Sequence, residues 1–476
     1  MIIGMLCFMG ALSAFAEERP NIIFVITDDM SWGEIARTGN KIIRTPNLDC
    51  LYDQSLRFRN FHVASYCAPT RAQLMSGRQE FFAGVTDTRY ERDNLRDDIT
   101  ILPQYFKQAG YRTAMVGKWH LASKELGLTG KPLSPHKRGF DMALYTRNQL
   151  GRYNPWLSRN GKQEEFQGYC GDIIFDETMK WIENGDEEQP YFVYLATSIP
   201  HGPLVAPEEF RKMYEGSGLT EKEITYYAMV SNVDTNMGRL MKWLEKRQDK
   251  RKTILIFMTD NGHSCTKGFD GAGHNRDGFL RPDGLYNAGL RGGKGQQWHG
   301  GTCVPFLLYW PGIADQGRDD TTLTGGIDIL PTFCDIAGVK PDDMGIQGVS
   351  LLPNILEEST HVPENRIIFS HGGRWNYPTE MGKYKYNVAV ITDRYRLVWE
   401  PDGKKGQNMV AKENSALYDY RSDPGEKQNI IDLHPELVQG LTAAYEAWWE
   451  EAKKGMVNDW HQIKTGKLIG PEKEKK

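Results

Sequence analysis

The sequence of 476 residues lacks the features that mark several classes of protein. It has no CxxC pair, and its seven cysteines are widely scattered, which predicts neither a disulfide framework nor a zinc site. Its formal net charge of −4 argues against a general nucleic-acid-binding protein. It shows no internal repeat, and beyond residue 16 no stretch is long and apolar enough to cross a bilayer. The sequence therefore predicts a globular protein that neither binds nucleic acid nor inserts stably into a membrane.

The N-terminus is the one long apolar run. Residues Met1 to Ala16 end in Ala14-Phe15-Ala16 and are followed at once by Glu17. This pattern is typical of a secretory signal peptide with an Ala-x-Ala cleavage site, although no Lys or Arg precedes the apolar run. A membrane anchor is the alternative, for which the run is short. We predict a signal peptide at residues 1–16 and an exported protein, either periplasmic or secreted.

The middle of the chain alternates between apolar runs of strand length and helical patterns. Strands are predicted at residues 21–27, 111–116, 191–197, 253–258 and 304–310, and helices at 45–56, 101–109, 172–182, 221–246 and 326–337. Continuous apolar runs are expected of strands that are buried on both faces of a parallel sheet. The alternation predicts an α/β fold over residues 17–365, with a doubly wound, mostly parallel sheet flanked by helices.

The pattern changes from about residue 366. Residues 387–392 and 395–399 flank Asp393-Arg394 and predict a hairpin, and a helix is predicted from 435 to 453. We expect residues 366–464 to form a small C-terminal α+β subdomain with an antiparallel sheet and a helix. Residues 465–476 are rich in Lys and Glu and are predicted to be a disordered tail.

Polar side chains follow the ends of four predicted strands. They are Asp28 and Asp29, Lys118 and His120, His201, and Asp260 and Asn261. In open α/β sheets, ligands bind at this carboxyl edge. The oxygen ligands of the three acids and Asn261 suit a hard divalent cation, Ca²⁺ or Mg²⁺. Each pair alone could be a helix cap or a turn, but two adjacent acids repel each other unless a cation neutralises them.

A short helix is predicted around Cys67. Pro69 suits the first helical position, and Gly77 suits the residue after the last turn. Cys67 would then lie at the positive end of a helix dipole, where an anion is stabilised, and Arg71 follows one turn later. An ordinary half-buried cysteine at a helix start is the alternative interpretation.

The pentapeptide Cys67-Ala68-Pro69-Thr70-Arg71, followed by Leu-Met-Ser-Gly-Arg at 74–78, resembles the activation motif of the type I sulfatases, the arylsulfatase-like family of the alkaline phosphatase superfamily. In that family a formylglycine-generating enzyme recognises the Cys, Pro and Arg and oxidises the cysteine to formylglycine, whose hydrate is the nucleophile. Further motifs extend the resemblance over nearly the whole chain. They are Gly117-Lys118-Trp119-His120, Pro200-His201-Gly202-Pro203, Arg291-Gly292-Gly293-Lys294-Gly295, Trp298-His299-Gly300-Gly301 and Leu417-Tyr418-Asp419.

The resemblance implies a set of site residues. The implied ligands of Ca²⁺, for which Mg²⁺ is the alternative, are Asp28, Asp29, the modified Cys67, Asp260 and Asn261. The residues implied to be catalytic are Cys67, Arg71, Lys118, His120, His201 and Lys294. Those implied to bind substrate are Arg71, Lys118, His201, Lys294 and His299. Because His299 stands where relatives often have Glu, the subsite beside it is expected to differ.

The resemblance also implies a mechanism. A hydroxyl of the formylglycine hydrate attacks sulfur while Ca²⁺ and the cationic side chains stabilise charge on the sulfate oxygens. His201, with Lys294, protonates the departing sugar oxygen, and His120 takes the proton from the remaining hydroxyl, so that sulfate leaves and the aldehyde is restored. The two histidines could exchange these roles.

Two segments, residues 147–156 and 264–290, could line a specificity pocket in which Arg residues contact carboxylates or further sulfates. Two solvated surface loops are the alternative.

We predict a sulfuric ester hydrolase that releases inorganic sulfate from a sulfated carbohydrate. Its predicted partners are that sulfated saccharide and, during maturation, the formylglycine-generating enzyme. The alternatives are a phosphonate or phosphate ester hydrolase of the same superfamily, and a catalytically inactive glycan-binding relative. The intact set of catalytic residues argues against the last.

Overall fold

The computed structural model describes residues 19–122, 133–247, 249, 251–264, 285–356, 362–399 and 413–470. The predicted signal peptide, most of the segment 264–290 and the last six residues of the predicted tail lie outside these ranges. Within the described residues, no helix has both the length and the apolar character that crossing a membrane requires.

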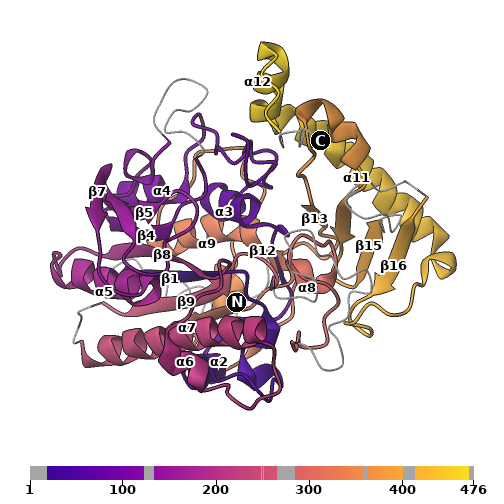
Figure 1. Cartoon of the computed structure of the whole chain (residues 1–476). Coiled ribbons are helices and arrows are strands. Elements are labelled where there is room, and N and C mark those ends of the chain that lie inside the picture. The colour runs from indigo at the N-terminus through magenta and orange to yellow at the C-terminus, as the bar shows by residue number, and fades with distance from the viewer. Residues whose placement is uncertain are drawn as a thin grey trace, which may run out of the picture.

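Ten of the described strands form one large sheet (Figure 1). In spatial order they are β11 (Asp319–Asp320), β2 (Leu56–Phe58), β10 (Phe306–Tyr309), β9 (Thr253–Thr259), β1 (Asn21–Asp28), β8 (Tyr191–Pro200), β4 (Arg112–Lys118), β5 (Met142–Thr146), β6 (Trp156–Arg159) and β7 (Lys162–Glu165). The five from β9 to β5 run parallel to one another, whereas β10, β6 and β7 pair antiparallel with their neighbours. The predicted doubly wound, mostly parallel sheet is confirmed.

Helices cover both faces of this sheet, as Figure 1 shows. One face packs against α3 (Cys67–Ser76), α4 (Leu102–Gln108) and α9 (Ile329–Ala337), and the other against α2 (Pro46–Gln54), α5 (Cys170–Glu183) and α7 (Glu221–Lys246). In β1 the side chains alternate, so Phe24 and Ile26 join the first core while Ile23 and Val25 join the second. Both faces of β1 are buried, which explains its unbroken apolar sequence.

Shorter elements complete the part of the chain that carries the large sheet. They are β3 (Phe61–His62), β12 (Thr324–Gly325), α6 (Glu208–Lys212), α8 (His299–Thr302), α10 (Leu352–Ile355) and 3₁₀ turns at Trp32–Glu34, Ala36–Thr38, Pro135–Lys137 and Gly326–Asp328. Two predicted helices are therefore shorter than expected. The one predicted at 45–56 ends at Gln54 because Leu56 pairs into β2, and the one predicted at 326–337 opens with a 3₁₀ turn.

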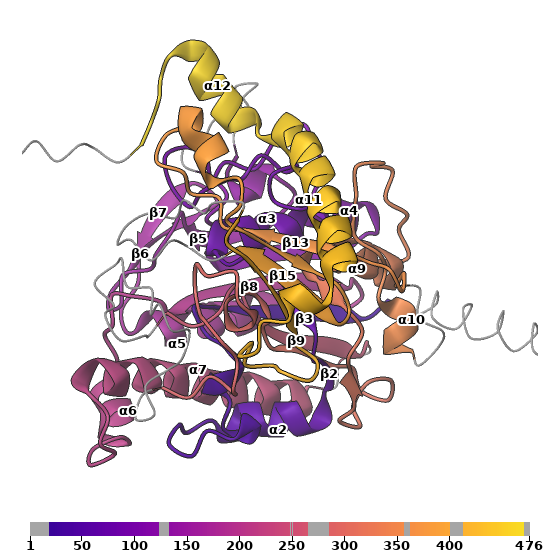
Figure 2. The same cartoon turned by 90° about the vertical axis from the view of Figure 1, so that its right-hand side faces the viewer.

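A second sheet is formed by the C-terminal part of the chain. It is antiparallel, in the order β13 (Ile368–His371), β14 (Val388–Ile391), β15 (Tyr395–Trp399) and β16 (Ser415–Asp419), with a 3₁₀ turn at Pro378–Tyr384. The predicted hairpin around Asp393-Arg394 is β14–β15. One face packs under α11 (Pro435–Gly455), which crosses the sheet in Figure 2, and the other meets Trp298 and Leu323 of the part that carries the large sheet.

The chain leaves this sheet through a 3₁₀ turn at Ile431–Leu433, α11 and α12 (Val457–Thr465). The tail was predicted to be disordered from residue 465. Thr465 is the last residue of α12, and the N–H of Ile469 donates to Oε1 of Gln462 at 3.1 Å, so the chain stays bound to α12 after the helix ends.

Candidate active site

Four strand ends meet at the carboxyl edge of the large sheet. β1 lies between β9 and β8, and Thr27 pairs with Thr259 while Asp28 pairs with Pro200. β4 lies on the far side of β8, with Gly117 opposite Ala196. Because the parallel strands end at the same level, the polar residues that follow them gather in one place. Gly117 allows the close approach, since a Cβ there would lie 2.0 Å from the carbonyl oxygen of Ala196.

Three buried carboxylates occupy this place, and each is paired with a cation. Lys118 Nζ lies 2.7 Å from Asp28 Oδ2, Lys294 Nζ lies 2.8 Å from Asp29 Oδ2, and Arg71 Nη2 lies 2.8 Å from Asp260 Oδ2. Buried charges are tolerated when they are paired in this way. Although burial alone would raise it, the pKa of Asp28 is held well below its usual value by Lys118, His201, Arg71 and Lys294.

Helix α3 carries Cys67 to the same place, but not as predicted. The helix begins at Cys67 itself, with Tyr66 as its N-cap, so Pro69 is the third helical residue and not the first. Proline is tolerated there because the N–H groups of the first turn have no partner inside the helix. Gly77 closes the helix in the left-handed conformation, as predicted. Sγ of Cys67 and one carboxylate oxygen each of Asp28 and Asp260 lie within 4.8 Å of one another.

The Cys67 thiol is a poor nucleophile as it stands. Its side chain is buried, and burial raises the pKa of the thiol despite the nearby Lys118 and Lys294. The reactive form of a cysteine is the thiolate, which this environment disfavours at neutral pH.

Arg71 differs from the two lysines in what it can reach. Its Nε and Nη2 both donate to Asp260, and its Nη1 donates to the carbonyl oxygen of Lys118 at 2.9 Å. The guanidinium is fully buried. Arg71 is therefore placed to position Asp260 and the end of β4, whereas the lysines present one mobile ammonium group each.

The two histidines have different surroundings. His120 is buried, and its Nε2–H donates to the carbonyl oxygen of Thr88 at 3.1 Å, which leaves Nδ1 as an unprotonated acceptor without a partner among the described residues. Burial, together with Lys118 and Arg71, lowers the pKa of His120 well below its usual value. His120 is therefore a neutral imidazole with a free lone pair.

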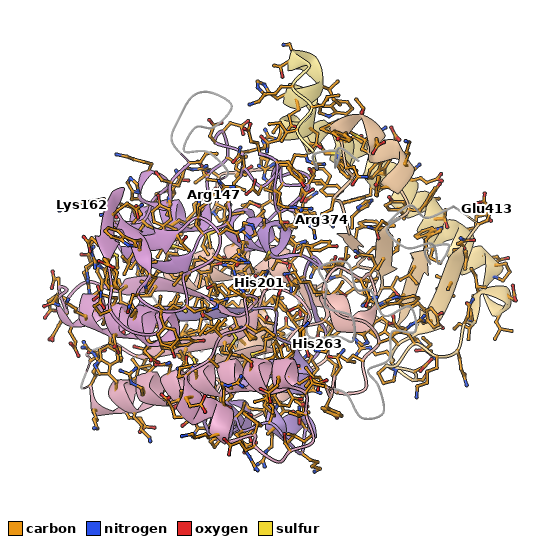
Figure 3. The ribbon with its side chains drawn as sticks, viewed as in Figure 1. Arg147, Lys162, His201, His263, Arg374 and Glu413 are labelled. Carbon is orange, nitrogen blue, oxygen red and sulfur yellow. The ribbon has the colours of Figure 1, made fainter. Side chains whose placement is uncertain are left out.

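His201 is partly exposed, and Figure 3 labels its position. Its Nδ1 lies 2.7 Å from the carbonyl oxygen of Gly202, and its Nε2 lies 3.6 Å from Asp29 Oδ2. The side chains of His201 and Lys294 are 20% and 16% exposed, whereas that of Lys118 is fully buried. A bound ligand would therefore meet His201 and Lys294 first.

The donor set fits a hard divalent cation. Oδ1 of Asp28 and Oδ1 of Asn261 are buried and have no hydrogen-bond partner among the described residues, although Asn261 Nδ2 donates to Asp29 at 2.8 Å. Unsatisfied buried oxygens are costly unless a ligand takes them. Carboxylate and amide oxygens are the ligands that Ca²⁺ and Mg²⁺ prefer.

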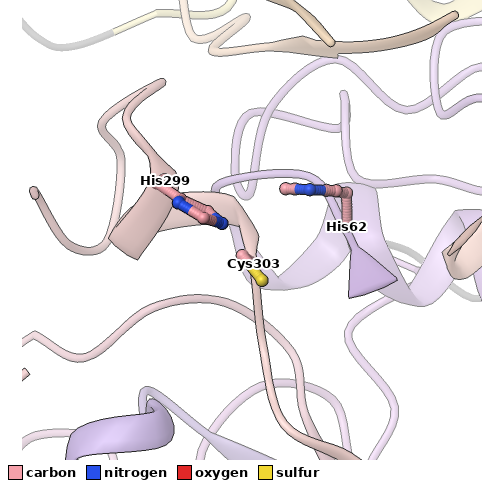
Figure 4. Close-up of side chains that lie close together, drawn as sticks. All are labelled: His62, His299 and Cys303. Carbon is pink, nitrogen blue, oxygen red and sulfur yellow. The ribbon is translucent and has the colours of Figure 1, made fainter. Parts of the chain in front are cut away.

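His299 is not brought to this group. Its buried ring stacks on His62 with the centroids 5.7 Å apart, lies edge-on to Tyr420, and stands close to Cys303 (Figure 4). Its backbone N–H donates to Glu426, whose carboxylate pairs with Arg396 at 3.0 Å. The surroundings of His299 are those of a packing residue between the two sheets, so the structure does not support its predicted contact with substrate.

His62, His299 and Cys303 have the residue types of a soft metal site. However, Nη2 of Arg396 lies 3.4 Å from Nδ1 of His62, where its charge would repel a cation. Burial lowers the pKa of His299 to about 3, so its imidazole is neutral. We therefore read the cluster as a structural one.

Two residues that the sequence analysis did not single out lie next to residues of this group. Gln149 Nε2 lies 2.8 Å from Nδ1 of His201, and Arg374, from the loop after β13, lies over the ring of Tyr66. Gln149 belongs to the segment 147–156, whose Arg147 and Trp156 line a pocket with Trp119 and Tyr145. Two residues of the segment 147–156 thus line a cavity, and its role in specificity stays a prediction. Arg374 follows Gly372-Gly373, a turn signal that gave no indication of where the side chain points.

A family model described as sulfatase matches residues 20–339, and one described as N-sulphoglucosamine sulphohydrolase, C-terminal, matches residues 297–450. The first covers more than half of the chain, so the chain belongs to the sulfatase family and is a sulfuric ester hydrolase.

Relatives align over most of the chain. N-acetylgalactosamine-6-sulfatase of Mus musculus is 26% identical, over 96% of this chain and 90% of that protein. The uncharacterized sulfatase YdeN of Escherichia coli K12 is 29% identical, over 89% of this chain and 84% of that protein. Among solved structures, Ps i-CgsB in complex with k-i-k-neocarrahexaose has the same fold, with a TM-score of 0.75 and 24% identity over 90% of this chain and 93% of that one.

The buried pair of Arg71 and Asp260 can be compared with an exposed one. We expect Arg71→Met to lower the free energy of unfolding by about 3–5 kcal/mol, because it leaves the Asp260 carboxylate buried without its partner. Arg37→Met removes the partner of Asp53 at the surface and should leave the free energy of unfolding nearly unchanged, because water and salt screen exposed ion pairs. Urea unfolding of both variants measures the difference. Equal losses would show that Arg71 does not compensate a buried charge.

Proposed function

We propose that this sulfatase releases inorganic sulfate from a sulfated carbohydrate, with formylglycine at position 67 and one Ca²⁺ at the carboxyl edge of the sheet. The observation that carries the proposal is the convergence of Cys67, at the N-terminus of α3, with three carboxylates, two lysines and two histidines. A hydrated formylglycine would supply the hydroxyl nucleophile that the buried thiol cannot.

Two comparisons favour a carbohydrate as the substrate. The mouse relative is named for a sulfated amino sugar, and the structural neighbour was solved with a neocarrahexaose. The apolar residues 1–16 support a further part of the proposal, export to the periplasm or the medium, where sulfated polysaccharides are met.

The cation would be held by Asp28, Asp29, Asp260 and Asn261, together with position 67. When bound, a divalent cation neutralises the adjacent acids and polarises a sulfate oxygen. Lys118 and Lys294 are within reach of the same oxygens, since each ammonium group already points at one of these carboxylates. They would stabilise the negative charge of the transferring sulfuryl group.

The surroundings of the two histidines favour one division of roles. His201 lies at the open side next to Lys294, where the sugar oxygen departs, so it would donate the proton to that oxygen. His120 lies at the closed side, and its free Nδ1 lone pair suits the base that takes a proton from the remaining hydroxyl of the formylglycine hydrate. The carbonyl oxygen of Thr88 fixes the tautomer that this role needs.

The first test is sulfate release from a panel of defined sulfated saccharides, by protein from a host that installs formylglycine. We expect release by the wild type and its complete loss in Cys67→Ala, which removes the nucleophile. Cys303→Ala is the matched control, because Cys303 is also buried but belongs to the His62 and His299 cluster.

Mass spectrometry of position 67 accompanies every assay. Faster turnover of phosphate or phosphonate esters would contradict the proposed substrate class. Sulfate release by a protein whose residue 67 is still cysteine would contradict the proposed nucleophile.

A second test separates the acid from the base. A sugar alkoxide is a much stronger base than 4-nitrophenolate and therefore needs a proton donor in order to leave. We expect the drop in kcat of His201→Ala to be at least 100-fold larger on a sugar sulfate than on 4-nitrophenyl sulfate. His120→Ala should lose activity on both substrates by a similar factor. The assignment is wrong if the two variants show the opposite pattern.

A third test addresses the cation. After dialysis against calcium-free buffer, metal analysis should find one Ca²⁺ per chain in the wild type and less than a tenth of that in Asn261→Ala, because Asn261 supplies an unsatisfied oxygen. Asp53→Asn, at the surface, should keep its calcium. Full sulfate release by protein that retains no divalent metal would refute this part of the proposal.

A further inference from the structure

We propose that Arg374 forms a second anion-binding subsite beside the catalytic group, which takes a second sulfate or a carboxylate of the same saccharide. The inference rests on the proposed function and deepens it, because it specifies a substrate with two negative groups.

Arg374 belongs to the C-terminal subdomain. It follows β13 in a turn where Gly373 and Arg374 both have left-handed backbones, with φ of 52° and 54°. A left-handed backbone is unfavourable for a residue with a side chain, and Asp29 and His120 of the catalytic group share it. A hydrogen bond holds the turn in place, since the N–H of Arg374 donates to the carbonyl oxygen of Thr86 at 3.0 Å.

The guanidinium of Arg374 is held next to the nucleophile position. It lies over the ring of Tyr66, 4.4 Å from the centroid, and Tyr66 is the residue directly before Cys67. Burial alone would lower the pKa of Arg374, but Tyr66, Asp87 and Cys67 raise it, so the group stays charged. A guanidinium stacked on an aromatic face keeps its N–H edges available for a planar or tetrahedral oxyanion.

The same short stretch of chain connects Arg374 to the base. Thr86 accepts from Arg374, Asp87 pairs with it at 3.4 Å, and Thr88 accepts from His120. Arg374 and His120 therefore contact the same stretch of three consecutive residues. A saccharide whose sulfate lies at the catalytic group would have its neighbouring substituents within reach of Arg374.

Three guanidinium groups lie near the carboxylate of Asp87. Among the described residues, Asp87 is the carboxylate that pairs with Arg374, and it also pairs with Arg92 at 2.9 Å and lies 4.0 Å from Arg89. One carboxylate is thus shared by three guanidinium groups, although Arg92 has a second acid, Asp459, at 3.7 Å. The Arg374 side chain is 23% exposed and open to a ligand. An anion that binds there would pair with the exposed part of the Arg374 guanidinium.

The experiment compares matched saccharides, each with one sulfate and with a second sulfate or a uronate carboxylate added. We expect Arg374→Gln to raise KM for the two-charge members at least tenfold, while kcat and the KM of the one-sulfate members stay within twofold. Arg374→Lys keeps the charge but loses the two parallel N–H donors of the guanidinium, so its KM for the two-charge members should lie between those of the wild type and Arg374→Gln. Arg394→Gln, on the exposed hairpin, is the control and should match the wild type.

Wild-type salt dependence provides a measurement that needs no variant. KM for the two-charge members should rise more steeply with ionic strength than KM for the one-sulfate members. Comparing KM for saccharides that carry a second sulfate with KM for those that carry a carboxylate identifies which oxyanion the subsite prefers.

Three results would overturn the inference while leaving the sulfatase reaction intact. In Arg374→Gln, KM could rise equally for both classes of saccharide, or it could stay unchanged for the two-charge members. In the wild type, KM could depend equally on salt for the two classes. An equal rise with a lowered melting temperature would assign Arg374 to holding the subdomain in place. If no sulfate is released from any saccharide by formylglycine-bearing wild type, the proposed function itself fails.

Discussion

The active site depends on the mutual neutralisation of charges that have been removed from water. Asp28, Asp29 and Asp260 are fully buried where β1 and β9 end, and each would be strongly unfavourable there alone. Lys118, Lys294 and Arg71 compensate them one for one. Because a buried charge tolerates little displacement from its partner, this requirement fixes the positions of β4, α3 and the loop that carries Lys294 relative to β1.

The same constraint explains how the residues divide their work. Arg71 donates to Asp260 and to the carbonyl oxygen of Lys118, so it holds these two residues in position. Lys294 and His201 remain partly exposed and face the ligand. The unsatisfied oxygens of Asp28 and Asn261 leave room for a cation among the acids. The site is therefore poised for an anionic ester, with its fixed charges already in place.

The sequence predicted the fold well wherever burial imposed a simple pattern. The run at residues 21–27 became β1, and the long helix was predicted at Glu221–Lys246 as observed, because its apolar stripe is a local signal. The start of α3 was misplaced by two residues, since proline suits any position of a first turn. His299 was assigned to substrate from its place in a motif, whereas its packing against His62 and Tyr420 depends on residues more than a hundred positions away.

By itself, the sequence determined the chemistry that this protein carries: the order of strands and helices, the acids and bases at the strand ends, and the cysteine motif at a helix start. These follow from local periodicity and from residue types, which act over a few positions. Only the tertiary structure decided which cation pairs with which carboxylate, which ring nitrogen of His120 keeps its lone pair, and that Arg374 reaches Tyr66 from the other subdomain. Those outcomes depend on distances between segments far apart in the chain, and such distances are set by the packing of the two cores.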